Sequence, residues 1–221
     1  GDKAIFAFGV ASGAALSNVS NLVNNSGVVQ TAATGVGTAR RSLAGVTFGD
    51  DKAIFGYGYA GSYSSLTNLV SNSGVVATDT SGVGSTRESL AATTYGSSGQ
   101  ALFGYGDTGS ASSLTNLISN TGVVSADVTG VGTARGELAA AAYGGDKGIF
   151  GYGVGNKSMT NLVSNTGVVA TDVSGVGTGR KLLAACAYGG DKAIFGYGNN
   201  AGGGSGSDLS LTNLVNNNVV V

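Results

Sequence analysis

One phrase recurs five times along the chain, and this repetition limits the possible folds more than any other feature. The phrase is a version of "AIFGYG", with spacings of 49, 48, 47 and 45 residues between its phenylalanines, Phe6, Phe55, Phe103, Phe150 and Phe195. A version of "LTNLVSN" follows each copy, and versions of "GVGTARxxLAAAxYG" join one copy to the next. Such a period indicates a supersecondary unit that buries its apolar face against neighbouring copies of itself.

Four short apolar segments can be recognised in a repeat, and they are named a, b, c and d in chain order. Examples are Leu138 to Tyr143 for a, Lys52 to Tyr57 for b, Leu114 to Ser119 for c, and Val168 to Val173 for d. Their lengths are those of strands, and no segment has helical periodicity over ten or more residues. Glycine-containing stretches typical of hairpin turns separate a from b and c from d, as at Tyr143 to Lys147 and Ser164 to Gly167.

Four strands in a unit of about 47 residues are typical of a β-propeller blade. We therefore predict an all-β fold, a five-bladed β-propeller formed by one domain, 1–221, with repeats at approximately 1–37, 38–84, 85–132, 133–177 and 178–221. Segment a has the smallest residues, so we expect it to be the inner strand near the crowded axis and d to be the outer strand. A β-solenoid is the main alternative, but it needs polar capping units, and the end copies here resemble the middle ones.

The number of strands predicts an irregular first blade. Segments b, c and d each occur five times but a occurs four times, which makes nineteen strands, one short of twenty. The blade that contains Phe6 should therefore lack its inner strand, and its open edge would be vulnerable to pairing with another chain. A reduced first blade in a simple ring is the favoured explanation. A chain cut from a longer repeat array and a neighbouring subunit that fills the gap are the alternatives.

Charge is scarce in this chain, and its distribution excludes several classes of function. Charged residues make up 10%, the net charge is −1, and histidine is absent. Without clustered lysine or arginine, duplex nucleic acid is a poor partner, and no apolar run is long enough for membrane insertion. The absence of histidine removes the usual Ser-His-Asp and Cys-His nucleophile systems and the commonest transition-metal ligand. We therefore expect no enzyme activity, no cofactor and no metal site.

Carboxylates are the remaining candidates for acid–base chemistry, and each set has a structural explanation. Glu88 and Glu137 fit solvated turn positions, and an aspartate recurs on segment d at Asp79, Asp127 and Asp172. A further group belongs to the a–b hairpin: Asp2, Asp51, Asp146 and Asp191. Glycosidase chemistry by a pair of carboxylates stays open as an alternative.

Two groups of residues are candidates for binding. An arginine recurs before segment a, at Arg40, Arg87, Arg135 and Arg180. It should lie near one mouth of the ring, where it either binds a ligand or hydrogen-bonds carbonyls and a neighbouring aspartate to tie blades together. The second group is in the b–c loop, where the repeats differ most: Tyr59, Tyr63, Asp107, Asn156, Lys157, Asn199 and Asn200, with an insertion from Asn199 to Asp208. Variable loops on a fixed scaffold commonly carry binding, although drift in an unconstrained loop gives the same pattern.

The repeat resembles a kelch-type blade. Kelch blades run from an arginine, through a small-residue first strand, to a second strand ending in paired glycines, and the matching residues here are Arg135, Leu138 to Tyr143 and Ile149 to Gly153. The chain differs in having Gly-Tyr-Gly for the glycine pair and no tryptophan. The stretch from Thr160 to Arg180, "TNLVSNTGVVATDVSGVGTGR", is also similar to repeats in predicted phage tail-fibre-like and metagenomic proteins. These resemblances imply a propeller architecture and a binding role on a virion or cell surface.

We therefore predict a non-enzymatic binding module, multivalent and either lectin-like or receptor-binding, whose partner is a glycan or a cell-surface receptor. Near-identical repeats would present repeated weak sites, and multivalency raises avidity without a single strong site. Neutral Asn, Ser, Thr and Tyr side chains suit sugar hydroxyls. The module would be virion-associated or extracellular, and a monomer or weak homo-oligomer. The alternative is a structural or assembly module of a virion or surface fibre.

Overall fold

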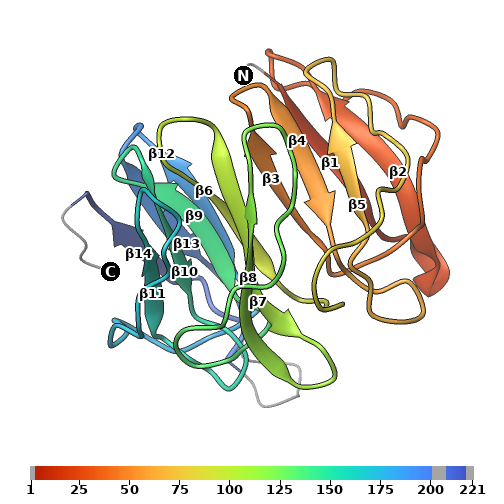
Figure 1. The fold of residues 1–221 in the computed structure, drawn as a ribbon. Coiled ribbons are helices and arrows are strands. Elements are labelled where there is room, and N and C mark those ends of the chain that lie inside the picture. The colour runs from red at the N-terminus through yellow and green to blue at the C-terminus, as the bar shows by residue number, and fades with distance from the viewer. Residues whose placement is uncertain (1–2, 201–207, 218–221) are drawn as a thin grey trace.

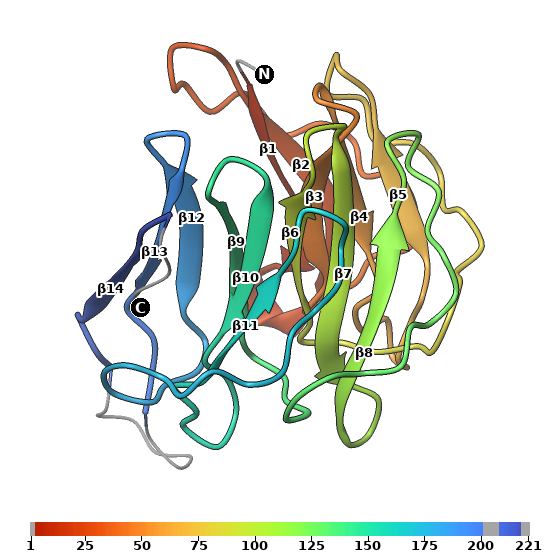
Figure 2. The same ribbon diagram turned by 60° about the vertical axis from the view of Figure 1, so that its left-hand side comes forward.

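The computed structural model describes residues 3–200 and 208–217, and within them the chain is all-β. The strands form five small antiparallel sheets that follow one another along the sequence (Figure 1 and Figure 2). A single 3-10 turn, η1 (Ser12–Ala14), is the one helical element in the described part of the chain. The prediction of an all-β fold is confirmed.

The first sheet has two strands and each later sheet has three. The first contains β1 (Ala4–Val10) and β2 (Leu16–Val23), and the second contains β3 (Ala44–Phe48), β4 (Lys52–Gly56) and β5 (Thr67–Val70). The third contains β6 (Ala91–Tyr95), β7 (Gln100–Asp107) and β8 (Ala111–Ile118), and the fourth contains β9 (Ala139–Tyr143), β10 (Lys147–Gly151) and β11 (Thr160–Val163). The fifth contains β12 (Ala184–Tyr188), β13 (Lys192–Gly196) and β14 (Thr212–Val215).

Segments a, b and c form the three strands in the order a–b–c, with b in the centre of each complete sheet. The a strands of successive sheets lie beside one another, β3 next to β6, β6 next to β9, and β9 next to β12. Small residues fill these strands because each inner strand must fit between two others. In the first sheet β1 is segment b and β2 is segment c, so that sheet has no inner strand among the described residues.

Segment d does not form a regular strand, so the prediction of four strands in each blade is wrong in this respect. In the second repeat it contacts β5 through two isolated bridges, at Val76 and at Thr80, and the pairing shifts by one residue between them. Such a shift is a β-bulge. Nδ2 of Asn68 donates to the carbonyl of Ala77 at 3.0 Å in this irregular stretch, where it takes the place of a backbone donor. The equivalent amides in three other repeats do the same: Asn21, Asn116 and Asn161.

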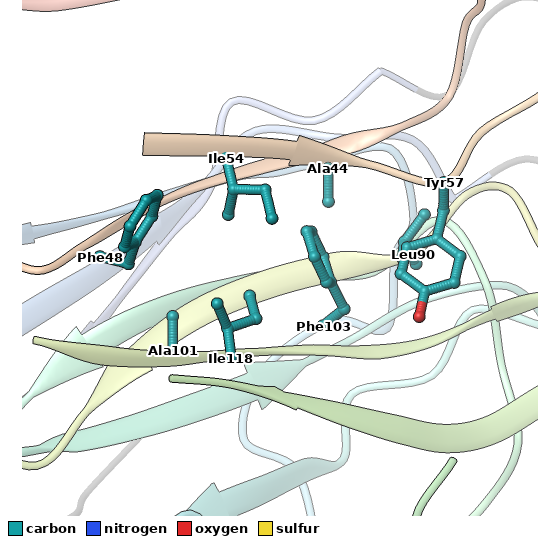
Figure 3. Packing of buried hydrophobic residues seen from close by; sticks show 8 residues of the cluster. All are labelled: Ala44, Phe48, Ile54, Tyr57, Leu90, Ala101, Phe103 and Ile118. Carbon is teal, nitrogen blue, oxygen red and sulfur yellow. The ribbon is translucent and has the colours of Figure 1, made fainter. Parts of the chain in front are cut away.

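The apolar core lies between successive sheets. Figure 3 shows the cluster that joins the second sheet to the third, with Ala44, Phe48, Ile54 and Tyr57 facing Leu90, Ala101, Phe103 and Ile118. Equivalent clusters join the third sheet to the fourth and the fourth to the fifth. Glycine at position 56 permits this approach, because a Cβ atom on Gly56 would lie 2.6 Å from Cζ of Phe103.

The tyrosine of the Gly-Tyr-Gly stretch joins its sheet to the next one in the second, third and fourth repeats. Tyr57 has a φ of 65°, a left-handed conformation that is uncommon for a residue with a side chain. Its ring packs edge-on against Phe103, with 5.1 Å between ring centres, and its hydroxyl donates to the carbonyl of Val83 at 3.0 Å. Burial raises the pKa of Tyr57 and of Tyr105 to about 12. The later junctions repeat the ring contact, Tyr105 with Phe150 and Tyr152 with Phe195.

The outer faces of the first and last sheets are exposed. Phe6 in β1 is 65% exposed, although Phe103 at the same position of the third sheet is fully buried. In the last sheet Tyr197 is 63% exposed and Leu214 is 57% exposed, on the face that a following sheet would cover. The described residues therefore form a series of five packed sheets with an uncovered face at each end.

Candidate binding face

The loops between segments b and c lie at one end of the sheets, and this end is named the loop face. Segment b ends where segment a begins, since the two strands are antiparallel and Gly56 pairs with Ala44. The loop after b therefore lies beside the residues that lead into a, as the pairing of Arg41 with Tyr59 shows. The variable loops and the approaches to the inner strands are thus brought together on the loop face.

One backbone position in each of four repeats takes part in a chain of hydrogen bonds on the loop face. The N–H of Ser89 donates to the carbonyl of Ser42 at 2.8 Å, that of Glu137 to Ser89 at 2.9 Å, and that of Leu182 to Glu137 at 3.0 Å. All four residues are left-handed, with φ between 53° and 55°. A cavity of about 320 Å³ is lined by these four residues and by the leucine that follows each of them. The inner strands of four sheets therefore converge on one shared opening.

Two tyrosines and an aspartate form the contact between the loops of the second and third sheets. The rings of Tyr59 and Tyr63 pack edge-on with 5.8 Å between centres, and the Arg41 guanidinium lies 5.1 Å from the centre of the Tyr59 ring. The Tyr63 hydroxyl donates to Oδ1 of Asp107 at 3.3 Å, and the same oxygen accepts from the N–H of Gly109 at 2.7 Å. Desolvation and the Asp107 carboxylate raise the pKa of Tyr63. Tyr59, Tyr63 and Asp107 are each half-buried, so part of every side chain still faces solvent.

The loops of the fourth and fifth sheets meet through amides. Nδ2 of Asn156 donates to the carbonyl of Asn200 at 2.7 Å, and Nδ2 of Asn199 donates to Oδ1 of Asp208 at 2.8 Å. Lys157 lies next to this contact and is half-buried. Residues 201–207 of the long loop lie outside the described residues. The predicted loop residues are thus brought together in two groups, one aromatic and acidic and the other rich in amides.

The recurring arginines lie inside the protein. The side chains of Arg40, Arg87, Arg135 and Arg180 are fully buried. In Arg87, Nη2 donates to Oδ1 of Asn116 at 2.6 Å and Nη1 donates to the carbonyl of Ser85 at 3.2 Å. Burial lowers the pKa of Arg87, although the neighbouring Tyr57 and Asp127 oppose this shift. Of the two roles expected for these arginines, the contacts fit the one that hydrogen-bonds carbonyls and ties neighbouring sheets together.

An aspartate on segment d completes three of the four arginine clusters, those of Arg40, Arg87 and Arg135. Asp79 accepts hydrogen bonds from the N–H and hydroxyl of Thr38 at 2.9 and 2.7 Å and from Nδ2 of Asn68 at 2.9 Å, and lies 3.7 Å from Nη1 of Arg40. Burial alone would raise the pKa of Asp79, but these hydrogen bonds and Arg40 lower it below its usual value. The equivalent aspartates, Asp127 and Asp172, make the same contacts in the next two repeats. This network is structural, because it holds the approach to an inner strand against segment d.

The remaining acidic residues are dispersed. Glu137 lies 2.9 Å from Nζ of Lys181, and the hairpin aspartates pair with the lysines that follow them: Asp51, Asp146 and Asp191. Asp2 lies outside the described residues. Within residues 3–200 and 208–217, no three His, Cys, Asp or Glu side chains are grouped as a metal site requires. The same part of the chain contains no helix of the length and apolarity that a membrane span needs.

No protein-family model matches the chain, and no curated protein matches it in sequence.

Among the residues between each recurring arginine and its inner strand, sequence reasoning named only Glu88 and Glu137, as turn charges, and missed the others. Arg41 stacks on Tyr59, and the position after it supplies the backbone chain at the shared opening. A signal was present in the sequence, since these two positions vary within an otherwise nearly constant stretch and hold Ser, Ser, Glu and Leu at the second position. Such variation is expected where the backbone makes the conserved contact and the side chain faces outward.

Proposed function

We propose that the chain is a non-enzymatic binding module that recognises cell-surface glycans through its loop face. The observation that carries the proposal is the group formed by Tyr59, Tyr63 and Asp107 between the loops of neighbouring sheets. Ligand sites combine apolar and aromatic surface with a few well-placed polar groups. Sugar rings stack on aromatic side chains and their hydroxyls donate to carboxylates, so this group offers both kinds of contact in one place.

The scaffold that we propose for this face is a five-bladed, propeller-like arrangement of the kelch type, open between the first and the last sheet. The shared opening lined by four repeats and the side-by-side inner strands support this arrangement. In this arrangement the first blade has no inner strand among the described residues. The loop faces of all blades would then surround one axis, as the binding loops of propellers do.

Binding is multivalent in this proposal, with several weak sites acting together. The amide-rich group around Asn156 and Asn200 gives a second polar contact surface on the same face. Many copies displayed on a virion or an extracellular surface would multiply the sites, because tethering raises the effective concentration of each further contact. The isolated chain would be a monomer or a weak homo-oligomer.

A glycan array at high protein density tests the proposal, followed by saturation-transfer NMR with each sugar that binds. Replacing Tyr63 by Ala should abolish the signal, because it removes the ring that contacts Tyr59 and the hydroxyl that orders Asp107. Tyr188→Ala, an exposed tyrosine on the outer face of the last sheet, is the matched control and should leave binding unchanged. Absence of binding to every glycan, or equal loss in both variants, would overturn the proposal.

The second candidate function is a structural or assembly module of a surface fibre. A row of exposed valines favours it, since the first valine of segment d is 56 to 65% exposed in four repeats: Val28, Val75, Val123 and Val168. Apolar side chains at one position in successive repeats offer a strip for packing against another subunit. This function predicts stable oligomers by light scattering that dissociate when Val75 and Val123 are replaced by Ser.

A further inference from the structure

We propose that the inner edge of the first sheet is a receptor site for an extended peptide segment of type a, with the sequence pattern of this repeat. This site is separate from the loop residues assigned to glycan binding. Three neighbouring features support this proposal. They are the unpaired edge of β1, a cavity beside that edge, and hydrogen-bond acceptors in the first sheet that bind a buried arginine in the other repeats.

The edge of β1 has the geometry to accept one more strand. In the described residues β1 pairs only with β2, whereas β4, β7, β10 and β13 at the same position pair on both sides. Extended peptides add to such edges through backbone hydrogen bonds. The pairing of β3 with β4, Ala44 with Gly56 and Phe48 with Lys52, sets the register. Transferred to β1, it places the first alanine of the incoming segment opposite Ala7 and its aromatic residue opposite Lys3.

A cavity occupies the place that the missing strand would fill. Its volume is about 630 Å³, and its walls include Ile5 of β1, Leu22 of β2, Val46 of β3 and Phe55 of β4. At the next junction the corresponding space holds β3, which packs against β6 and β7. The cavity is therefore the gap that an inner strand leaves between the first and second sheets.

The groups that would receive the arginine of the incoming segment are present in the first sheet. In the complete repeats this arginine donates from Nη2 to an asparagine Oδ1, and in Arg40 and Arg135 Nε also donates to the carbonyl of the Gly-Tyr-Gly tyrosine. The equivalent asparagine is Asn21, whose Nδ2 donates to Gln30 while its Oδ1 has no partner in the described part of the chain. The equivalent carbonyl belongs to Phe8. Ala32 stands where Asp79 lies in the second repeat, so no carboxylate is left without its arginine.

The backbone chain on the loop face also ends at this gap. Ser42 accepts from Ser89 but its own N–H makes no hydrogen bond to the described residues, and Ser42 is exposed. A further segment of type a would supply the carbonyl for that N–H, as Ser42 does for Ser89. The occupant is therefore identified by the pattern of this repeat: an arginine, two variable residues, a leucine, then small residues and an aromatic residue.

The probe is a synthetic peptide with the sequence of residues 130–144, "GVGTARGELAAAAYG", added to the full chain. We expect one peptide to bind per chain by calorimetry and the melting temperature to rise with peptide concentration, because only the folded chain binds the peptide. The same residues in scrambled order should do neither. Failure of the ordered peptide to bind at millimolar concentration, or equal binding of the scrambled one, would overturn the inference.

Cross-linking tests the register. In a Cys186→Ala background, Phe6→Cys should form a disulfide with a peptide that carries cysteine at the position of Ala140, the partner of Phe150 in β9 and β10. Cysteine at the position of Ala141 should not cross-link, since neighbouring residues of a strand point to opposite faces. Cross-linking at both positions alike would contradict strand addition.

Asn21→Ala tests the arginine site. It should weaken binding of the peptide about tenfold or more, the usual effect of losing a hydrogen bond to a charged group. Asn21→Ala should not further weaken the binding of a peptide in which Arg135 is replaced by Ala. Asn156→Ala on the loop face is the control and should leave peptide binding unchanged, whether or not it affects glycans. If Asn21→Ala has no effect on either peptide, the arginine does not bind there and the proposed site is wrong.

Discussion

The guanidinium of Arg87 lies 4.1 Å from the centre of the Tyr57 ring, although the two residues belong to neighbouring sheets. The same stacking joins Arg135 to Tyr105 and Arg180 to Tyr152, at 4.5 and 4.0 Å. In each case the ring belongs to a left-handed residue and the arginine is fully buried. The contact that holds one sheet to the next is therefore a buried cation on an aromatic ring, fixed by an asparagine from the arginine's own sheet.

Removing one of these arginines should destabilise the fold strongly. Arg87→Ala should lower the free energy of unfolding by roughly 3 kcal/mol or more, because Asn116 and Asp127 lose their partner inside the protein. Arg87→Lys should also destabilise, since a lysine does not reproduce the planar set of donors. Urea unfolding followed by tyrosine fluorescence measures both. Arg41→Ala, which removes an exposed arginine, should change stability by less than about 0.5 kcal/mol. An equal loss of stability in Arg87→Ala and Arg41→Ala would contradict the structural role of Arg87.

The glycine at the end of segment b should tolerate alanine only in the last sheet. In Gly56 and Gly104 an added Cβ atom would lie 2.6 Å from the phenylalanine ring of the next sheet. Gly56→Ala should therefore cost about 1 to 3 kcal/mol by overpacking. In Gly196 the nearest atom would be 3.6 Å away, within ordinary contact. Gly196→Ala should leave the melting temperature unchanged or raise it slightly, and similar melting temperatures for both variants would show that the packing at the junction is not tight.

Acid should weaken the fold through the aspartates of segment d. Hydrogen bonds and the neighbouring arginine hold the pKa of Asp79 below the value of about 3.9 in an unfolded chain. As the pH falls, the unfolded chain takes up the proton first. The stabilisation by Asp79 is therefore fully present above the unfolded pKa and is lost as the pH falls through the lower pKa of the folded protein. Unfolding by urea between about pH 6 and pH 2 should show this decline. Asp79→Asn should flatten it, while Asp50→Asn in an exposed hairpin should not.

Alkali should weaken the fold through the buried tyrosines. The pKa of Tyr57 and of Tyr105 is about 12, against about 10 in an unfolded chain. The unfolded chain therefore loses the proton first, and stability falls as the pH rises from about 10 towards 12. Tyr57→Phe should make this fall less steep, although it also removes the hydrogen bond to Val83. Tyr197→Phe is the matched control, because its ring is exposed, and equal slopes in the two variants would contradict the prediction.

Much of the fold could be predicted from the repeat. Glycine-rich hairpins and short apolar runs predicted segments a, b and c, and the four occurrences of segment a predicted a first sheet without an inner strand. Segment d could not be predicted as irregular, because valines and threonines favour a strand there. The bulge depends on the side chain of Asn68, which replaces a backbone donor to Ala77. A side chain that acts in place of backbone leaves no trace in the hydrophobic pattern.

The candidate site was predicted in part. The loop residues were found because they vary, and the structure brings Tyr63 and Asp107 together across two repeats. The burial of the arginines could not be predicted, since a regularly spaced charged residue is as compatible with an exposed position at the mouth of the ring as with a buried one. Their aromatic partners belong to the preceding repeat, and Tyr57 reaches Arg87 only by adopting a left-handed backbone. Sequence spacing carries no information on that conformation.

The backbone chain through Ser42, Ser89, Glu137 and Leu182 has a consequence for how such a protein changes over time. Its bonds join main-chain atoms, so the link between two repeats does not depend on which side chains stand at these positions. A gene that duplicates or loses one repeat would therefore keep every remaining junction intact, without compensating substitutions. The loops could meanwhile diverge singly, and a lineage could alter both the number of units and the surface that each presents.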